Sequence, residues 1–537
     1  MIPLNESHTP FYLPIILRVV LFLSAALLFA RLSELTLIKG TYFRALAEEN
    51  RIRRVAIDAP RGKIKARGGE ILADNIEEKK TVEFDSKEGY KKVDVLENTP
   101  ADEVLTEWKR SYPLGSVAGH ITGYIGEVNQ AEVGKADPGC VDKGVRGLGT
   151  VVGKFGIEQQ YECLLRGTPG EELVEVDIKG EKIRTVGRHA ATPGQDVTTT
   201  IDYGLQKRVA LDMKDSVGAA VVTDGHGQIL AFHTSPSFDP AIFTEKEKEK
   251  ELTQTLTDKR LPLFNRATTG TYHPGSIFKL VTSVAGLEGG EITPAYEYDD
   301  TGLIKINDFS YSTWYFTQYG KTEGKINVVR ALARSTDTFY YKLGELVGID
   351  ELVKWADAFG VGHKTNVDLP AESSGLLATP EWKQRVLGER WFLGNTYHMA
   401  IGQGDMLVTP LQANVLTSVV ASRGYLCNPH FLLNSHESCH KLPISEATLT
   451  TVTEGMKGAC ATGGTAYPFF GFEPVVACKT GTAETGEKDI THAWFTVFAP
   501  AVNPEIVVTV LVEKGGEGSK VAAPIAKAIL QYRFHER

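Results

Sequence analysis

An apolar run near the N-terminus constrains this chain more than any other feature. Residues 11–32 read FYLPIILRVVLFLSAALLFARL and are almost entirely apolar. Their number is close to the ~20 residues that a helix needs to cross a bilayer. Arg18 interrupts the run, and its charged end would have to extend toward the lipid headgroups. The run predicts one transmembrane helix ahead of a large folded body.

A cleaved signal peptide is the alternative to a retained anchor. The apolar part is long for a signal peptide, and the residues FARLSELTLIKG at its end contain no small-x-small cleavage site, so an anchor is favoured. Residues 1–17 contain no lysine or arginine, whereas Arg31, Lys39 and Arg44 follow the run. The positive-inside rule alone would therefore leave the body in the cytoplasm.

Composition describes an ordinary globular body. The chain has 537 residues, of which 42% are hydrophobic and 23% charged, and its length predicts several domain-sized units. The net charge of -9, without a basic stripe, argues against nucleic acid as the main partner.

The periodicity of apolar residues gives a coarse map of elements. We expect a helix followed by strands over 40–75, a short helix within 101–112, and strands with turns over 117–195. A strand and an amphipathic helix follow from residue 197, and later stretches are helical. Strands return in the last hundred residues, before a closing helix. Strands at both ends with helices between them predict one sheet in a large α/β domain.

Three short motifs carry the chemistry. They are Ser-x-x-Lys at Ser276–Lys279, Ser-x-Asp at Ser335–Asp337 and Lys-Thr-Gly at Lys479–Gly481. The first two motifs each occur twice, and only these copies follow one another in that order. Further copies at Ser438–Lys441 and Ser237–Asp239 lie in loops or turns. For Ser276 itself the alternative is a helix N-cap, but the complete ordered set favours the signature of penicillin-binding proteins and serine β-lactamases.

The residue types suit acyl transfer through a serine. Ser276 needs a base to take its proton, and Lys279 can do so only when neutral, so burial and a like charge from Lys479 should lower its pKa. Ser335 would relay a proton to the leaving amine. The hydroxyls of Thr480 and Thr482 would bind a substrate carboxylate, and the backbone N–H groups of Ser276 and Thr482 would form an oxyanion hole.

Longer segments extend the match beyond these motifs. GKFGIEQQYECLLRGTPG (153–170), GNTYHMAIGQG (394–404) and EGSKVAAPIAKAIL (517–530) all resemble class B penicillin-binding proteins, and the chain is most similar to the elongation-type penicillin-binding protein 2 group. Asp337 also resembles the elongation branch, since division-type relatives usually have asparagine there. The resemblance covers the chain from about residue 31 to the C-terminus.

The resemblance implies an architecture and a location. It implies a short cytoplasmic tail (1–10), a transmembrane anchor (11–32), a mostly β pedestal (33–196), and an α/β transpeptidase domain of the serine β-lactamase type (197–537). The body would lie outside the inner (cytoplasmic) membrane, against the weak charge count. The pedestal would contact a membrane-embedded glycan polymerase of the RodA type.

The resemblance also implies a peptidoglycan D,D-transpeptidase that cross-links stem peptides during elongation and is acylated by β-lactams. The implied catalytic residues are Ser276, Lys279, Ser335, Asp337 and Lys479, and the substrate-binding residues are Thr480, Gly481 and Thr482. No cofactor is expected. Some relatives carry a metal near the active site, but residues 296–332 contain no histidine or cysteine, so none is expected there.

Two other functions stay open. A β-lactamase or β-lactam sensor would share the acylation step, although the anchored pedestal disfavours the first and the short N-terminal tail the second. A scaffold that activates a glycan polymerase would keep the fold without the activity.

Six cysteines offer three pairs. Cys427, His430, His436 and Cys439 have the spacing of zinc ligands, but a Cys427–Cys439 disulfide is favoured outside the cytoplasm. Cys460 with Cys478, and Cys140 with Cys163, are the other candidate disulfides.

Overall fold

The computed structural model describes residues 11–44, 52–85, 89–95, 104–135, 139–140, 143, 145–177, 182–435 and 438–536. The chain divides into two compact units. Unit 1 comprises Met1–Ala59, Lys79–Glu107 and Gly167–Pro193, and unit 2 comprises Pro60–Glu78, Trp108–Arg166 and Gly194–Arg537. The domain bounds predicted from the sequence stay a prediction.

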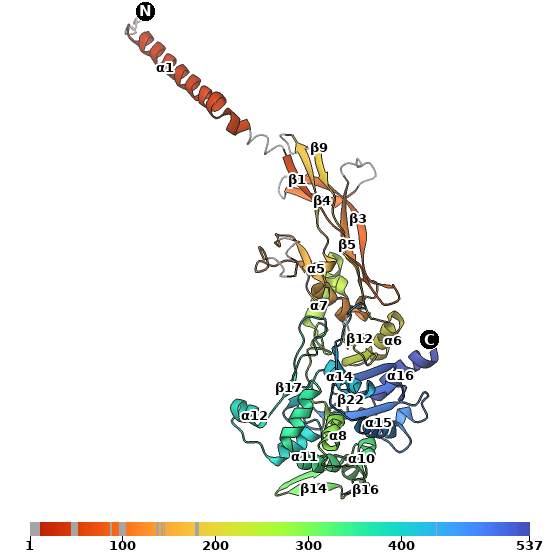
Figure 1. Ribbon diagram of the computed structural model, residues 1–537. Helices are drawn as coiled ribbons and strands as arrows, with labels where there is room; N and C mark the ends of the chain where they lie inside the picture. Colours follow the sequence, from red (N-terminus) through yellow and green to blue (C-terminus); the bar gives the residue numbers. More distant parts are fainter. Residues whose placement is uncertain are drawn as a thin grey trace, which may run out of the picture. The chain divides into compact units, whose positions relative to one another are not determined.

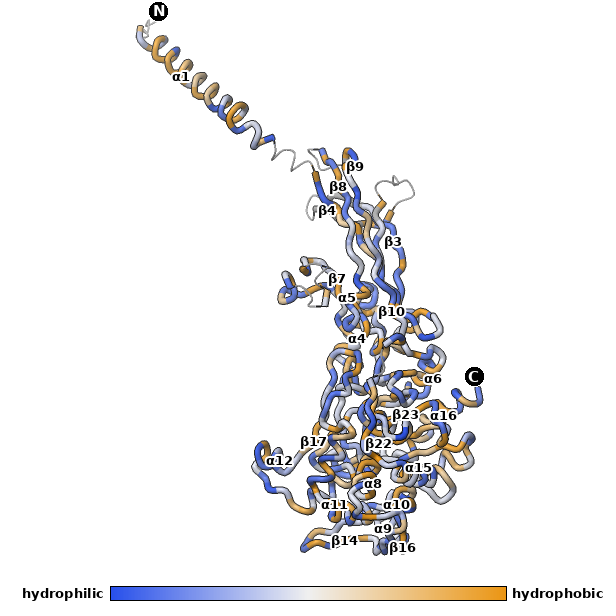
Figure 2. The backbone as a smooth tube through the Cα atoms, viewed as in Figure 1, coloured by the Kyte–Doolittle hydropathy of each residue, from blue (hydrophilic) through white to orange (hydrophobic). Residues whose placement is uncertain are grey.

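The apolar run forms α1 (Leu13–Ser33), which continues as a π-helical turn over Glu34–Ile38. Together they span 26 residues, within which an 18-residue stretch has a mean hydropathy of 2.5 and is not buried against the protein. Figure 2 shows α1 as a mostly hydrophobic helix along its length. This single helix is long and apolar enough to cross a membrane.

Two sheets lie ahead of the central sheet in the sequence. One has the antiparallel order β1-β8-β9, from β1 (Ile52–Ile57), β8 (Gly170–Val176) and β9 (Lys182–His189). The other has the order β10-β2-β3-β4, with β5 paired to β3. Its strands are β2 (Ile64–Lys65), β3 (Ile71–Asp85), β4 (Gly89–Asp94), β5 (Leu105–Ser111) and β10 (Val197–Thr198).

The short helix predicted within 101–112 is wrong where the structure describes this segment, because Leu105–Ser111 is strand β5. Its buried Arg110 reaches Glu158, with Nε 2.6 Å from Oε1. That partner is 48 residues away, so the local sequence does not reveal the contact that stabilises the strand. Tertiary context outweighs local propensity here.

Unit 2 is built on a five-stranded antiparallel sheet of order β12-β11-β23-β22-β21 (Figure 1). The strands are β11 (Gly218–Thr223), β12 (Ile229–Ser235), β21 (Ala477–Glu484), β22 (Thr491–Ala499) and β23 (Ile506–Val512). The first two come from the start of the domain and the last three from its end. The prediction of one sheet made from both ends of the domain is therefore confirmed.

Both faces of this sheet are covered by helices. In β22, Trp494 and Phe498 face one core while Phe495 and Val497 face the other, as the two-residue period of a strand requires. Helices α6 (Tyr203–Met213) and α16 (Ala522–Gln531) pack on the second face. On the first face lie α8 (Lys279–Glu288), α10 (Val328–Arg334), α11 (Asp337–Ala358), α14 (Pro410–Ala421) and α15 (Glu446–Cys460).

Shorter elements complete the fold. They are α3 (Gly119–Thr122), β6 (Ile125–Glu127), β7 (Val151–Gly153), α4 (Gly156–Gln160), α5 (Glu162–Leu165), α7 (Glu249–Thr257), β13 (Tyr298–Asp300), β14 (Leu303–Ile306), β15 (Phe309–Ser312), α9 (Trp314–Tyr319), β16 (Gly324–Ile326), β17 (Leu376–Leu377), α12 (Pro380–Leu387), α13 (Leu393–Ala400), β18 (Met406–Leu407), β19 (Tyr425–Cys427) and β20 (Cys439–Lys441).

All six cysteines form disulfides. The pairs are Cys140–Cys163, Cys427–Cys439 and Cys460–Cys478. The favoured disulfide interpretation of the Cys427–Cys439 segment is confirmed, and its two sulfurs are therefore not free to bind zinc. His436, the fourth residue of that motif, lies outside the described residues.

Candidate active site

Ser276 lies in a tight 3-10 turn, Gly275–Ile277, directly ahead of α8. The helix proper begins at Lys279. Gly275 has φ +54°, and a Cβ at this position would lie 3.0 Å from the carbonyl oxygen of Thr482. Its N–H donates to the Gly402 carbonyl at 2.8 Å. The turn is thus held against strand β21, which brings Ser276 next to the Lys-Thr-Gly motif.

The Lys279 side chain is completely buried at the start of α8. Its amine donates to the Ser335 carbonyl at 2.9 Å, to Ser335 Oγ at 3.2 Å and to Asp337 Oδ1 at 2.6 Å. The face of Tyr340 lies 5.1 Å from the same nitrogen. In the described part of the chain, the Ser276 hydroxyl itself has no hydrogen-bond partner.

Ser335 occupies the junction between α10 and α11. It caps α10 in the left-handed conformation, with φ 55° and ψ 40°, which is strained for a residue with a Cβ. This turn points its hydroxyl at a second amine, because Lys479 Nζ donates to Ser335 Oγ at 2.8 Å. One serine hydroxyl therefore contacts both motif lysines.

Lys479 lies on β21, at one edge of the central sheet, and is also completely buried. Besides Ser335 it contacts the carbonyl oxygen of Thr480 at 2.8 Å. Two buried amines thus share a single carboxylate, Asp337, which is paired with Lys279. The positive charge that the two lysines could carry exceeds the negative charge available to balance it.

This imbalance appears in the pKa values. Burial lowers the pKa of Lys279, and Asp337 only partly opposes that effect. Burial also lowers the pKa of Lys479 well below its ordinary value, and the neighbouring Lys279 lowers it further. The sequence predicts that the charge of Lys479 lowers the pKa of Lys279, whereas in the structure the like-charge effect is that of Lys279 on the pKa of Lys479. The direction expected for Lys279 is the one observed.

The rest of the Lys-Thr-Gly segment forms the wall of the site. Thr480 Oγ1 donates to Thr465 Oγ1 at 2.9 Å, and Thr482 is exposed. A Cβ on Gly481 would lie only 2.8 Å from Cβ of Trp494, so this strand position has no room for a side chain. The Thr482 carbonyl accepts a 3.4 Å hydrogen bond from Gln403 Nε2.

Sequence reasoning missed several neighbours of the motifs. Tyr340, three residues after Asp337 on α11, packs on Lys279 and pairs its hydroxyl with Ser283. Arg334, directly before the second motif, donates to the Gly463 carbonyl, and Thr465 accepts a hydrogen bond from Thr480 of the third motif. Only Tyr340 carried a signal, since a helix places residues i and i+3 on one face.

The second copies of the motifs lie elsewhere. Ser237 Oγ pairs with His120 Nδ1 at 3.3 Å, in a segment that follows β12 at the opposite edge of the sheet from β21. Ser438 adjoins the Cys427–Cys439 disulfide. Among the described residues, no group of three or more histidine, cysteine, aspartate or glutamate side chains is arranged to hold a metal.

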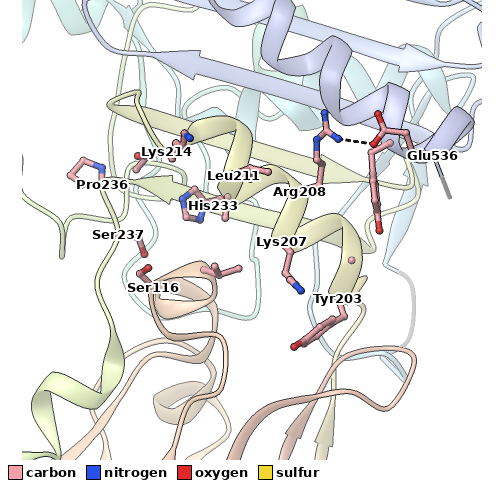
Figure 3. Close-up of a pocket in the computed structure, with 15 residues that line it drawn as sticks. Ser116, Tyr203, Lys207, Arg208, Leu211, Lys214, His233, Pro236, Ser237 and Glu536 are labelled. Carbon is pink, nitrogen blue, oxygen red and sulfur yellow. Dashed lines mark hydrogen bonds and ion pairs between the residues drawn. The ribbon is translucent and has the colours of Figure 1, made fainter.

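A cavity of about 770 Å³ lies apart from the motifs. Figure 3 shows it beside α6, with Tyr203, Lys207 and Leu211 on the helix and His233 on the strand behind it. It lies at the β12 edge, whereas Lys479 lies on β21 at the other edge. No residue of the three motifs lines this cavity.

Comparison with known proteins connects this geometry to a family. Residues 218–531 match the penicillin binding protein transpeptidase domain, and residues 79–199 match the penicillin-binding protein dimerisation domain. The first match alone covers more than half of the chain. The chain belongs to the penicillin-binding proteins.

Relatives within the family narrow the group. The peptidoglycan D,D-transpeptidase MrdA of Acinetobacter baumannii is 34% identical over 463 residues, which are 81% of this chain and 67% of that protein. MrdA of Escherichia coli is 33% identical over 454 residues, covering 79% of this chain and 71% of that protein.

Solved structures agree. Penicillin-binding protein 2 of Helicobacter pylori, in a complex with MreC, has a TM-score of 0.77 and 26% identity, and the match covers 90% of this chain and 99% of that one. Penicillin-binding protein 2 of Pseudomonas aeruginosa in complex with WCK 5153 has a TM-score of 0.74 and 29% identity, over 90% and 97% of the two chains. The family and fold predicted from the sequence are confirmed.

Proposed function

We propose that this chain is a membrane-anchored peptidoglycan D,D-transpeptidase of cell-wall elongation and cell-shape maintenance, with Ser276 as its nucleophile. The observation that carries the proposal is the meeting of two buried lysines on the hydroxyl of Ser335, beside the turn that holds Ser276. The family and its MrdA relatives supply the reaction class.

In the first half-reaction, Ser276 Oγ attacks the carbonyl carbon between the two D-Ala residues of a donor stem peptide. Neutral Lys279 takes the serine proton, and its lowered pKa favours that state. The C–N bond then breaks, Ser335 passes a proton to the departing D-Ala amine, and Lys479 positions the Ser335 hydroxyl. The product is an ester between Ser276 and the stem peptide.

In the second half-reaction, an amine of a neighbouring stem peptide attacks this ester. The attacking amine loses a proton to the neutral amine of Lys279. The ester bond then breaks, and Ser276 regains its hydroxyl proton from Lys279. Backbone N–H groups of Ser276 and Thr482 would stabilise the oxyanion in both halves, where losing one donor costs ~3 kcal/mol. Thr480 and Thr482 would bind the donor carboxylate, and Gly481 between them lets the strand pack closely against Trp494.

We further propose that α1 crosses the inner membrane once, with residues 1–10 in the cytoplasm and the body outside. The Cys427–Cys439, Cys460–Cys478 and Cys140–Cys163 disulfides support an oxidising compartment.

The pedestal (33–196) would contact a RodA-type glycan polymerase and the domain over 197–537 would carry the chemistry. A structural neighbour from a peptidoglycan synthase complex, with a TM-score of 0.76 and 29% identity, supports such a partner. Cross-linking in membranes with a photoreactive residue placed in the pedestal would test it.

Mass spectrometry of the intact full-length chain in detergent tests the activity, with and without a fluorescent penicillin. We expect a stable adduct on Ser276 that is absent from Ser276→Ala. We also expect the chain to release D-Ala from a donor peptide, and to form cross-linked product only when an acceptor amine is present. An adduct that is rapidly hydrolysed would favour a β-lactamase. A folded chain with no adduct and no D-Ala release would favour the scaffold and overturn the proposal.

A further inference from the structure

Arg334, the residue immediately before Ser335, makes contacts through both its side chain and its backbone carbonyl. Its Nε lies 2.5 Å from Glu323 Oε1, and its guanidinium lies 5.0 Å from the ring centroids of both Trp314 and Tyr315. Its backbone carbonyl accepts a 2.9 Å hydrogen bond from Trp314 Nε1. Both the side chain and the main chain of Arg334 are therefore fixed, and only 12% of the side chain is exposed.

The same guanidinium reaches a loop that contacts the third motif. Arg334 Nη1 donates to the carbonyl oxygens of Gly463 and Gly464, at 3.1 and 3.5 Å. These glycines lie in residues 461–466, which follow α15 and are called here the brace loop. Arg334 is thus the link from the Ser335 turn to this loop.

Two further contacts tie the brace loop to strand β21. Thr465, inside the loop, accepts the hydroxyl hydrogen bond of Thr480 at 2.9 Å. Cys460, at the end of α15, forms a disulfide with Cys478, the residue before Lys479. The loop is therefore tied both to the residue before the serine of the second motif and to the strand that carries the lysine of the third.

Ser335 needs such support because its backbone is left-handed, a strained conformation for a residue with a Cβ. An unsupported turn would relax and move Oγ away from the amines of Lys279 and Lys479, which lie 3.2 and 2.8 Å away. Glu323 is itself fixed, because its N–H donates to Asp300 Oδ2 at 2.8 Å.

We propose that Arg334 is a positioning residue for the transpeptidase reaction, which holds the Ser335 hydroxyl between Lys279 and Lys479 by fastening the Ser335 turn to the brace loop. This inference rests on the proposed function, since it assigns Ser335 to proton transfer. Arg334 acts through Ser335 and does not touch the reacting atoms.

The chain offers a matched control in Arg330, one turn earlier on α10. Arg330 Nη2 pairs with the other oxygen of the same Glu323 at 3.0 Å, but its side chain is 50% exposed. Replacing Arg330 with alanine removes an arginine from the same carboxylate and leaves the hydrogen bonds of Arg334 to the brace loop in place.

The experiment measures acylation of the full-length chain by a fluorescent penicillin, with the acylation rate constant separated from the binding constant of the initial complex. Active-site titration normalises each rate to folded protein. We expect Arg334→Ala to lower the rate constant by about 10²-fold with little change in binding, because misplacing one group by about 1 Å has effects of this size. Arg334→Lys, which keeps the charge but loses the planar fork, should recover only part of the rate. Arg330→Ala should stay within about twofold.

A structural role alone would lower the melting temperature of Arg334→Ala and leave the rate constant of its folded fraction unchanged, and that result overturns the inference. If Arg334→Ala does not fold, Arg334→Lys and Trp314→Phe provide the same test, because Trp314→Phe deletes the hydrogen bond to the Arg334 carbonyl and keeps an aromatic ring beside the guanidinium. Equal rate constants in these variants and the wild type would also overturn it. A wild-type chain that forms no adduct instead overturns the proposed function.

Discussion

Unit 2 contains two buried clusters of charged side chains that differ in their balance. The lysine cluster, defined as Lys279, Lys479, Ser335 and Asp337, has two amines and one carboxylate. The arginine cluster has three guanidinium groups and two carboxylates, and each guanidinium is paired directly with a carboxylate; its members are Arg61, Arg110, Arg166, Glu158 and Glu162. Both clusters are almost fully shielded from solvent.

The pKa values respond to this balance in opposite directions. Burial works against the charge of Arg61, yet Glu158 and Glu162 together raise its pKa above the ordinary value. In the lysine cluster the same burial is not compensated, and the pKa values of Lys279 and Lys479 fall. Burial alone therefore does not mark an active site. A shortage of counter-charge keeps a buried base neutral and ready to accept a proton.

The largest expected effect comes from removing the base. Lys279→Met should lower the rate of acylation by a fluorescent penicillin by about 10²–10⁴-fold, the range typical of a lost general base. Its melting temperature should fall less than that of Arg61→Met, because the Asp337 carboxylate that loses its partner is 17% exposed and the buried amine is replaced by an apolar chain of similar length. Stopped-flow fluorescence and calorimetry measure the two quantities. If Lys279→Met were acylated at the wild-type rate, Lys279 would not be the base, and the two clusters would not differ in function.

The arginine cluster should show the opposite behaviour. Arg61→Met leaves the buried carboxylate of Glu162 without its closest partner and should lower the free energy of unfolding by ~3–5 kcal/mol. The acylation rate of the folded protein should not change. The control is Arg54→Met, which breaks an exposed pair with Glu171 and should cost ~1 kcal/mol or less. Urea denaturation compares the variants, and equal losses in both would contradict the role of burial.

Removing the carboxylate of the lysine cluster should shift the pH dependence of the acylation rate. Asp337 raises the pKa of Lys279 against the lowering by burial, so Asp337→Asn should lower that pKa further. Because acylation requires neutral Lys279, the acidic limb of the rate profile should move to lower pH. The variant is compared with the wild type across buffers of constant ionic strength. A shift to higher pH would show that Asp337 does not act on Lys279 in this way.

The smallest effect concerns stability. In the unfolded chain, Lys479 keeps its proton up to its ordinary pKa of 10.5, whereas in the folded chain burial and Lys279 release it at lower pH. The unfolded state therefore binds more protons between the two pKa values, and stability rises with pH over that interval. Lys479→Met should lose this rise, which differential scanning fluorimetry detects. If Lys479→Met kept the wild-type increase of stability with pH, the lowered pKa of Lys479 could not be its cause.

The sequence predicted the lysine cluster but not the arginine cluster. Motif order and spacing identify Ser276, Ser335 and Lys479, because a fixed chemistry requires these residue types in one sequence pattern. Arg61 and Glu158 are 97 residues apart and belong to no motif, so only the fold pairs them.

The same limit explains the errors in detail. Residues 105–111 pair with β3 as strand β5, and Arg110 on this strand reaches Glu158, whereas their local pattern predicts a helix. Arg334 escaped notice because the carbonyls that it contacts belong to glycines 129 and 130 residues away. The central sheet, in contrast, was predicted correctly, since β22 and β23 are long and apolar enough to be recognised alone.

The most direct test of this difference is the titration of the two motif lysines themselves. The full-length chain, labelled with ¹³C at the lysine ε-carbon, is titrated by NMR, and the signals of Lys279 and Lys479 are assigned by their loss in the two methionine variants. We predict that both titrate below the ordinary lysine pKa of 10.5, with Lys479 well below it. If both titrate at or above that value, the lysine cluster holds no neutral base, and its contrast with the arginine cluster is wrong.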